Sequence, residues 1–133
     1  MSASFKEMKE HGKTTVTVDG RVVRNRPRYG SNNEGIKHNW ELVLKAASGL
    51  DYWVLWADAH SSFAMTPESL DLIIARLKTL KENGCIALAF TISNPIIPYY
   101  IRKIESEISI PFLASQSIDE IRTFIENTLE ELQ

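Results

Sequence analysis

The fold is decided by residues 52–90, which read YWVLWADAHSSFAMTPESLDLIIARLKTLKENGCIALAF. The runs WVLWA and CIALAF at its two ends are apolar without alternation, which is typical of strands buried on both faces of a sheet. The order strand, helix, strand predicts a parallel pair joined by a right-handed crossover. The apolar residues of the intervening helix recur at helical spacing and are Leu70, Ile73, Ile74, Leu77 and Leu80.

This helix has clear signals at both ends. Thr66 is suited to cap it, Pro67 fits the first helical position, and Glu68 complements the positive end of the helix dipole. Asn83 and Gly84 supply the C-terminal stop.

The chain that follows repeats this pattern. Asn94 and Pro95 give a second cap-plus-proline start, which predicts a helix to about Ser106. Residues 110–115 (IPFLAS) predict a third, shorter strand. The apolar stripe of the helix is Ile97, Tyr100, Ile101, Ile104 and Ile108.

A last helix closes the sequence. Ser117 is expected to cap it, with Glu120 three residues later completing a capping box. Its inward stripe is expected to be Ile118, Ile121, Ile125, Leu129 and Leu132.

On the amino-terminal side, residues 14–25 (TTVTVDGRVVRN) predict a β-hairpin. A type I′ turn at Asp19-Gly20 pairs Val18 with Arg21 and Val16 with Val23. The two-residue period then separates a core-directed face from a largely wet one. The first face holds Val16, Val18 and Val23, and the second holds Thr15, Thr17, Val22 and Arg24.

A helix from about residue 33 to residue 48 joins the hairpin to the central strand, with its stripe at Ile36, Trp40, Val43, Leu44 and Ala47. The elements together predict an α/β fold with one mixed sheet of about five strands, opened by a β-hairpin and covered by four amphipathic helices. Residues 1–12 are expected to form a flexible segment, and residues 13–133 a single domain.

The composition excludes several classes of protein. The 133 residues are 44% hydrophobic and 24% charged, as in globular domains, and no apolar run has the length of a membrane span. The single Cys85 excludes an internal disulfide, so the cytoplasm is the expected location. Nine basic and five acidic residues in 1–50 face six and twelve in 51–133, and the net charge of −2 gives no bulk attraction to nucleic acid.

Polar side chains follow the central strand at its carboxyl end, where open α/β sheets tend to place binding sites. They are Asp58, His60, Ser61, Ser62 and Thr66. Residues adjacent in sequence rarely converge as a catalytic triad, and the motif G-x-S-x-G is absent. We interpret them as polar loop residues and a helix cap, available to a partner or ligand.

Two further features carry an interpretation. Cys85 begins a buried strand, and no neighbouring base marks it as reactive. Arg24, Arg26 and Arg28 alternate along an extended chain, which favours a solvated face or an intermolecular ion-pair patch over phosphate binding.

The helix after Asn94 offers a second surface. If its stripe fills the core, Ile96 and Tyr99 lie on another face, and an apolar patch with an aromatic residue often marks a protein contact. The alternative is a wide buried stripe. Trp53 and Trp56 are expected on opposite faces of the central strand, both in the core.

The order of elements resembles the STAS (SpoIIAA-like) family, whose type member is a sporulation anti-anti-sigma factor. Residues 52–90 carry the resemblance, with a central strand that ends in Asp58, a loop, a helix that ends at Lys81-Glu82-Asn83-Gly84, and another apolar strand. The ending FLASQSIDEIRTFI also resembles the last strand and helix of that family.

Regulatory STAS domains carry Asp-Ser-Ser-Gly at the start of the second helix, with a serine that is phosphorylated. The chain has Met65-Thr66-Pro67-Glu68 there, with proline about where the phosphoacceptor belongs. The phosphorylation switch of the family is therefore not carried over. Phosphorylation of Thr66 is a separate prediction, favoured only because a phosphate there would lie at the positive end of a helix.

These observations predict a non-enzymatic cytoplasmic module of STAS-like fold that binds a protein partner or a second copy of itself, without a cofactor, a metal or nucleic acid. The expected contact surface is residues 60–66, the start of the following helix, and Ile96 with Tyr99. An enzyme that uses Asp58, His60 and Ser61 or Ser62 is the least favoured reading. The other alternative is a small-molecule or lipid site in a crevice lined by His60, Phe63, Met65, Asn94 and Tyr99.

Overall fold

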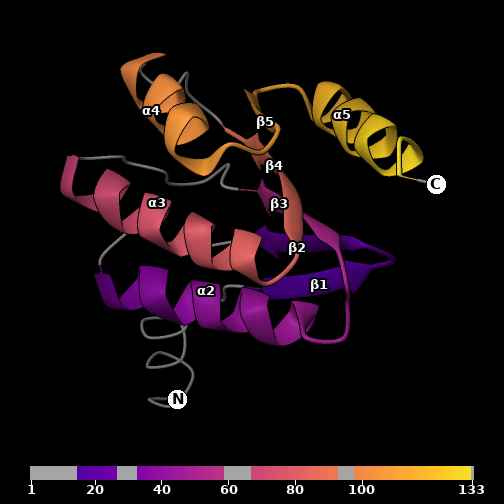
Figure 1. Cartoon of the computed structure of the whole chain (residues 1–133), viewed down its shortest axis with the longest axis horizontal. Coiled ribbons are helices and arrows are strands. Elements are labelled where there is room, and N and C mark those ends of the chain that lie inside the picture. The colour runs from indigo at the N-terminus through magenta and orange to yellow at the C-terminus, as the bar shows by residue number, and fades with distance from the viewer. Residues whose placement is uncertain (1–14, 27–32, 59–66, 93–97, 133) are drawn as a thin grey trace, which may run out of the picture.

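The computed structural model of the chain describes residues 15–26, 33–58, 67–92 and 98–132, and within them it shows one sheet of five strands with four helices (Figure 1). The predicted α/β class and the predicted order of elements are confirmed. The strands are β1 (Thr15–Asp19), β2 (Val22–Arg26), β3 (Trp53–Asp58), β4 (Cys85–Thr91) and β5 (Phe112–Ser115). The helices are α2 (Asn33–Ala47), α3 (Pro67–Glu82), α4 (Pro98–Ile108) and α5 (Ile118–Glu130).

The strands follow one another across the sheet in sequence order, with β1 antiparallel to β2 and all other neighbours parallel. Right-handed crossovers that advance in one direction place their helices on one face. Helices α2, α3 and α4 accordingly share one face of the sheet (Figure 1). Helix α5 follows the last strand, has no further strand to reach, and folds back onto the opposite face.

Two hydrophobic clusters result, one on each side of the sheet. The larger lies under α2, α3 and α4 and holds Trp53, Leu55 and Phe90, together with the predicted inward residues of α3. The smaller lies under α5 and holds Val54 and Trp56. All six residues of β3 are buried, and Trp53 and Trp56 lie on opposite faces, as predicted.

The hairpin has the predicted faces but a different register. Asp19 pairs with Val22 and Val18 with Val23, so the two loop residues are Gly20 and Arg21 rather than Asp19 and Gly20. Among the loop residues only Gly20 has a positive φ, at 61°, which is the pattern of a type II′ turn with glycine at its first position. Each strand is displaced by one residue, so every side chain stays on the face predicted for it. The prediction that Val18 is directed into the core was wrong, because Val18 is 46% exposed near the turn.

The α3–β4 connection depends on a glycine. Gly84 has φ +100°, and a Cβ built on it would lie 2.7 Å from the backbone oxygen of Asp51. Only glycine fits this close approach of two backbones, which explains the stop predicted at Asn83-Gly84.

Helix α4 ends at Ile108, two residues beyond the predicted Ser106, and its predicted start at Asn94-Pro95 lies outside the described residues. Ile104 and Ile108 are buried as predicted. The chain leaves α4 through Ser109, which has φ 59°, and the Lys81 ammonium donates to the Ile108 carbonyl at 3.0 Å.

The start of α5 departs from a simple capping box. The Ser117 hydroxyl accepts from the Glu120 amide at 3.2 Å, as predicted. The return contact passes through a third residue, because the Ser117 amide donates to the Ser115 hydroxyl, which donates to the Glu120 carboxylate. Ile121 and Ile125 are buried, but Ile118 and Leu132 are exposed, so the predicted stripe was wrong at its two ends.

Candidate functional site

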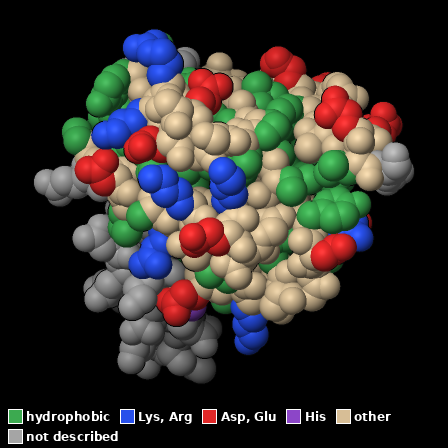
Figure 2. Space-filling model, viewed as in Figure 1, with side chains coloured by type: hydrophobic (Ala, Val, Ile, Leu, Met, Phe, Trp, Pro, Cys, Tyr) green, Lys and Arg blue, Asp and Glu red, His purple; other side chains and the backbone are tan. Residues whose placement is uncertain are grey.

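Helix α5 covers only part of its face of the sheet. It packs mainly over β4 and β5, and the side chains that β1 and β2 present on this face remain exposed or half-buried. Figure 2 shows acidic side chains gathered over α5 at the upper right, whereas basic and acidic side chains intermingle over α3 and α4 at the left.

A hollow of about 430 Å³ lies between the hairpin and α5, and we call it the hairpin groove. This volume is within the range of ligand sites in proteins. Its floor is apolar and its rim is polar and charged. The lining residues are Thr17, Asp19, Val22, Arg24, Trp56, Arg122, Ile125 and Glu126.

Trp56 organises the floor of the hairpin groove. Its indole nitrogen donates to the Thr91 hydroxyl at 2.6 Å, and this hydrogen bond fixes the orientation of the ring. Only 7% of the residue is exposed. The guanidinium carbon of Arg24 lies 3.9 Å from the centroid of the ring, and that of Arg122 lies 5.9 Å from it. Two cations from different elements therefore lie near one aromatic ring, and each is attracted by the negative face of its π-system.

Arg24 is held in place by a carboxylate from the next strand. Its Nη2 lies 2.6 Å from Oδ2 of Asp58, and Nε of Arg26 lies 3.5 Å from the same oxygen. The expectation of a solvated or intermolecular patch was therefore wrong for Arg24, because β2 and β3 are neighbours and place it beside Asp58. Arg26 is half exposed, as a solvated face predicts, and also pairs with Asp58. Arg28 lies outside the described residues.

The hairpin groove has opposite charges at its two ends. β2 runs from Val22 toward Arg24, in the direction of the other parallel strands, whereas α5 starts beyond the carboxyl end of β5 and packs back toward the amino ends. Arg122 therefore lies at the same end as Arg24, and Glu126, one turn later, lies toward Asp19 at the hairpin end. One end is cationic and the other acidic.

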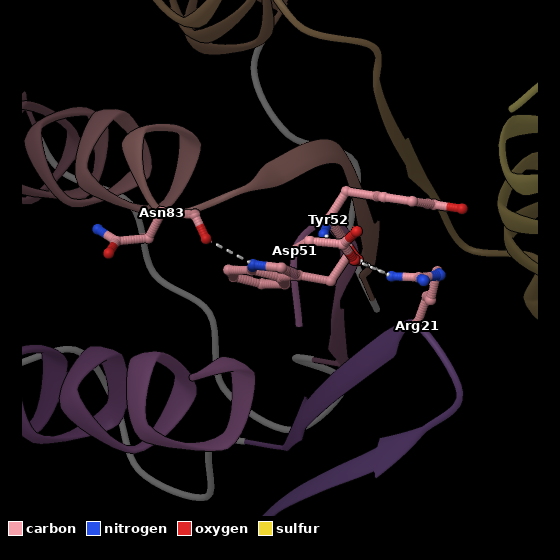
Figure 3. A network of polar contacts seen from close by, with 5 residues as sticks. Arg21, Asp51, Tyr52 and Asn83 are labelled. Atoms are coloured by element: carbon pink, nitrogen blue, oxygen red, sulfur yellow. Dashed lines mark hydrogen bonds and ion pairs between the residues drawn. The ribbon is translucent and has the colours of Figure 1, made fainter. Parts of the chain in front are cut away.

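A polar network at the amino edge of the sheet fixes the hairpin wall of the groove (Figure 3). Arg21 in the hairpin turn pairs with Asp51, donates to the Tyr52 carbonyl at 3.1 Å, and stacks on the Tyr52 ring at 3.8 Å. The Arg21 guanidinium holds the pKa of the Asp51 carboxyl below its usual value through their hydrogen bond. In the same network the Trp53 indole donates to the Asn83 carbonyl at 2.9 Å.

Most residues of the predicted contact surface lie outside the described residues. These are His60, Ser61, Ser62, Phe63, Met65, Thr66, Asn94 and Ile96. The two that are described are separate features. Asp58 is 9% exposed and ion-paired at the end of β3, whereas Tyr99 on α4 is 55% exposed, with its ring centroid 5.7 Å from that of Tyr100.

The crevice predicted at the carboxyl ends of the central strands is lined by His60, Phe63, Met65, Asn94 and Tyr99, of which only Tyr99 is described, so it stays a prediction. A hollow lined by described residues lies on the α5 face.

Cys85 is buried, as predicted, and its burial raises the pKa of the thiol to about 12. A thiol with this pKa stays protonated at neutral pH and is a poor nucleophile. Within the four described ranges, no three or more His, Cys, Asp or Glu side chains are grouped so that they could hold a metal ion.

The sequence analysis did not find the hairpin groove. One signal was present, because Arg122 is the only basic residue among the thirteen of α5, which also contains Asp119, Glu120, Glu126 and Glu130. A single cation on an acidic helix, at the position that faces the sheet beside the buried stripe, could have pointed to this place.

Comparison of the chain with protein-family models, with curated proteins and with solved structures finds no match in any of the three. Among the described helices, none has the length and apolar character needed to cross a membrane.

Proposed function

We propose that the chain is a non-enzymatic interaction module that binds a segment of a partner protein in the hairpin groove. The observation that supports this most directly is the half-covered α5 face. There the apolar floor of the groove lies between charged side chains of the hairpin and charged side chains of α5. Apolar centres with charged rims are the usual anatomy of protein interfaces.

The supporting contacts are preorganised. Trp56 is fixed by Thr91, Arg24 by Asp58, and the hairpin by the Arg21–Asp51 pair. A binding surface with few side chains left to order loses less conformational entropy when a partner docks. The surface around Tyr99 remains a second proposed contact, supported by the exposure of that ring.

Photo-crosslinking in cells tests the proposal. A benzophenone amino acid at position 17, on the exposed strand β1 in the groove, is compared with the same group at position 105, on the exposed face of α4. The proposal expects a discrete protein adduct from position 17 and little or none from position 105. Equal yields at the two positions, or no adduct from position 17, would contradict it.

A small-molecule or lipid ligand is the alternative, supported by the groove volume of about 430 Å³. A thermal-shift screen discriminates the two, because a ligand of the folded state raises the melting temperature. A compound that raises it in the wild type and not in Trp56→Ala would favour the alternative. The STAS-like assignment and the cytoplasmic location stay proposals, supported by the order of elements and by the single buried cysteine.

A further inference from the structure

We infer that the hairpin groove takes an amphipathic α-helix of a partner protein, with an acidic end beside Arg122 and a basic end beside Glu126. This inference rests on the proposed function and specifies its partner. It is carried by the free width of the sheet, the apolar floor and the distribution of charge.

The width of the sheet leaves room for one more helix. Neighbouring strands lie about 4.8 Å apart, so five strands span about 19 Å. A helix with its side chains is about 10 Å wide, and the opposite face of the same sheet carries the three helices α2, α3 and α4. Of the described helices only α5 lies on this face, over β4 and β5, and none of them covers the hairpin, which we call the vacant place.

The floor of the vacant place suits a narrow apolar stripe. Val22, Trp56 and Ile125 supply apolar surface along the centre of the groove, whereas Thr17, Asp19 and Arg24 border it. A helix with a few apolar residues at i, i+3 or i+4, and i+7, flanked by polar ones, matches this pattern. The polar border favours a partner that also exists free in solution over a permanent one.

Charge decides the two ends of the helix. At the cationic end Arg24 and Arg26 pair with the carboxylate of Asp58, and Arg122 adds a third cation near the Trp56 ring, so positive charge is in excess among the described residues there. At the other end Asp19 and Glu126 are both acidic. Opposite charges on the partner helix suppress wrong partners and fix its orientation.

The same charges disfavour a second copy of this chain. A symmetric dimer fills the groove only if each α5 lies over the other hairpin, which requires a two-fold axis parallel to the strands. Rotation about that axis leaves each residue at the same height along the strand direction. Arg122 of each copy would therefore lie beside Arg24 of the other. Glu126 would likewise lie beside Asp19, and both pairings bring like charges together.

Synthetic helices test the inference directly. Three stapled 15-residue peptides share one leucine stripe and differ only in their terminal charges. The bipolar peptide has Glu in the first turn and Lys in the last, the second has Lys at both ends, and the third has Ser in place of every charge. Each is titrated into the full-length ¹⁵N-labelled chain and followed by amide and indole shifts.

The bipolar peptide is expected to bind about tenfold more tightly than the doubly basic one, since one end of the latter meets like charge. The perturbed signals should be those of Val22, Arg24, the Trp56 indole and residues 122–126. Arg122→Glu should remove this preference, whereas Arg102→Glu, an exposed position on α4, should leave it unchanged.

Equal affinities for the three peptides, or shifts that map elsewhere, would overturn the inference. A specific adduct from position 17 without any peptide binding would leave the proposed function standing and show that its partner is not a helix. A dimer in sedimentation analysis, with shifts of the Val22 and 122–126 amide signals as the chain concentration rises, would identify a second copy as the occupant and would also overturn the inference.

Discussion

The Arg24 guanidinium lies against the face of Trp56, 3.9 Å from the ring centroid, and at the same time 2.6 Å from the Asp58 carboxylate. Arg24 is thereby desolvated on two sides, and its side chain is only 22% exposed. One residue thus links the floor of the hairpin groove to the carboxyl edge of the sheet.

Removal of this link should cost stability. Arg24→Ala is expected to lower the free energy of unfolding by about 2 kcal/mol, because Asp58 is nearly buried and loses the guanidinium that lies 2.6 Å from its Oδ2. Arg26→Ala is the matched control and should cost under about 1 kcal/mol, since Arg26 is half exposed and 3.5 Å away. Urea unfolding measures both, and equal losses would show that Arg24 has no special role.

Gly84→Ala should destabilise the chain by about 2 kcal/mol or more. The new Cβ would lie 2.7 Å from the Asp51 oxygen, at a φ of +100° that side chains rarely adopt. Gly49→Ala is the control, because a Cβ there meets nothing within 4 Å. Thermal unfolding of the two variants should differ clearly, and a Gly84→Ala protein as stable as Gly49→Ala would contradict the close approach.

Ser109→Gly should raise stability by about 0.5 kcal/mol. Ser109 has φ 59° at the end of α4, where glycine avoids the strain of a side chain, and this outweighs its greater freedom in the unfolded state. Ser106→Gly, inside the same helix, should instead lower stability by about 0.5 kcal/mol. Opposite signs in chemical unfolding are the expected result, and a loss in both variants would count against the left-handed conformation.

Cys85 should resist thiol reagents until the chain unfolds. Its folded pKa of about 12 exceeds the ordinary value of 9.0. Between these values the unfolded chain has lost the proton and the folded chain has kept it, so stability should fall as the pH rises from about 9 toward 12. Cys85→Ala, measured over the same pH range, should lack this part of the fall. Rapid labelling of the native protein at neutral pH would contradict the burial.

The sequence was sufficient for the fold because its signals are local. Uninterrupted apolar runs located β3 and β4. The register predicted for the hairpin was wrong by one residue on each strand, but such a displacement leaves each side chain on the same face of the sheet. The capping of α5 was half right, because the part played by Ser115 depends on where β5 ends relative to the helix. Nothing local indicated that Ile118 and Leu132 would lie outside the contact of α5 with the sheet.

The hairpin groove was missed in the sequence for a different reason. It is formed by strands and a helix about one hundred residues apart, and it exists because α5 leaves part of its face uncovered. The ion pair of Arg24 with Asp58 likewise follows from the pairing of β2 with β3. The contact surface predicted at residues 60–66 and 94–96 lies outside the described ranges and stays a prediction.

The most direct test of the hairpin groove as the binding surface is the yield of the position-17 crosslink in two charge-reversal backgrounds. Arg122→Glu alters the groove, and Arg102→Glu makes the same change in charge on α4. We predict that the adduct is strongly reduced by Arg122→Glu and kept in Arg102→Glu. An adduct that persists equally in both backgrounds would contradict a partner held in the groove.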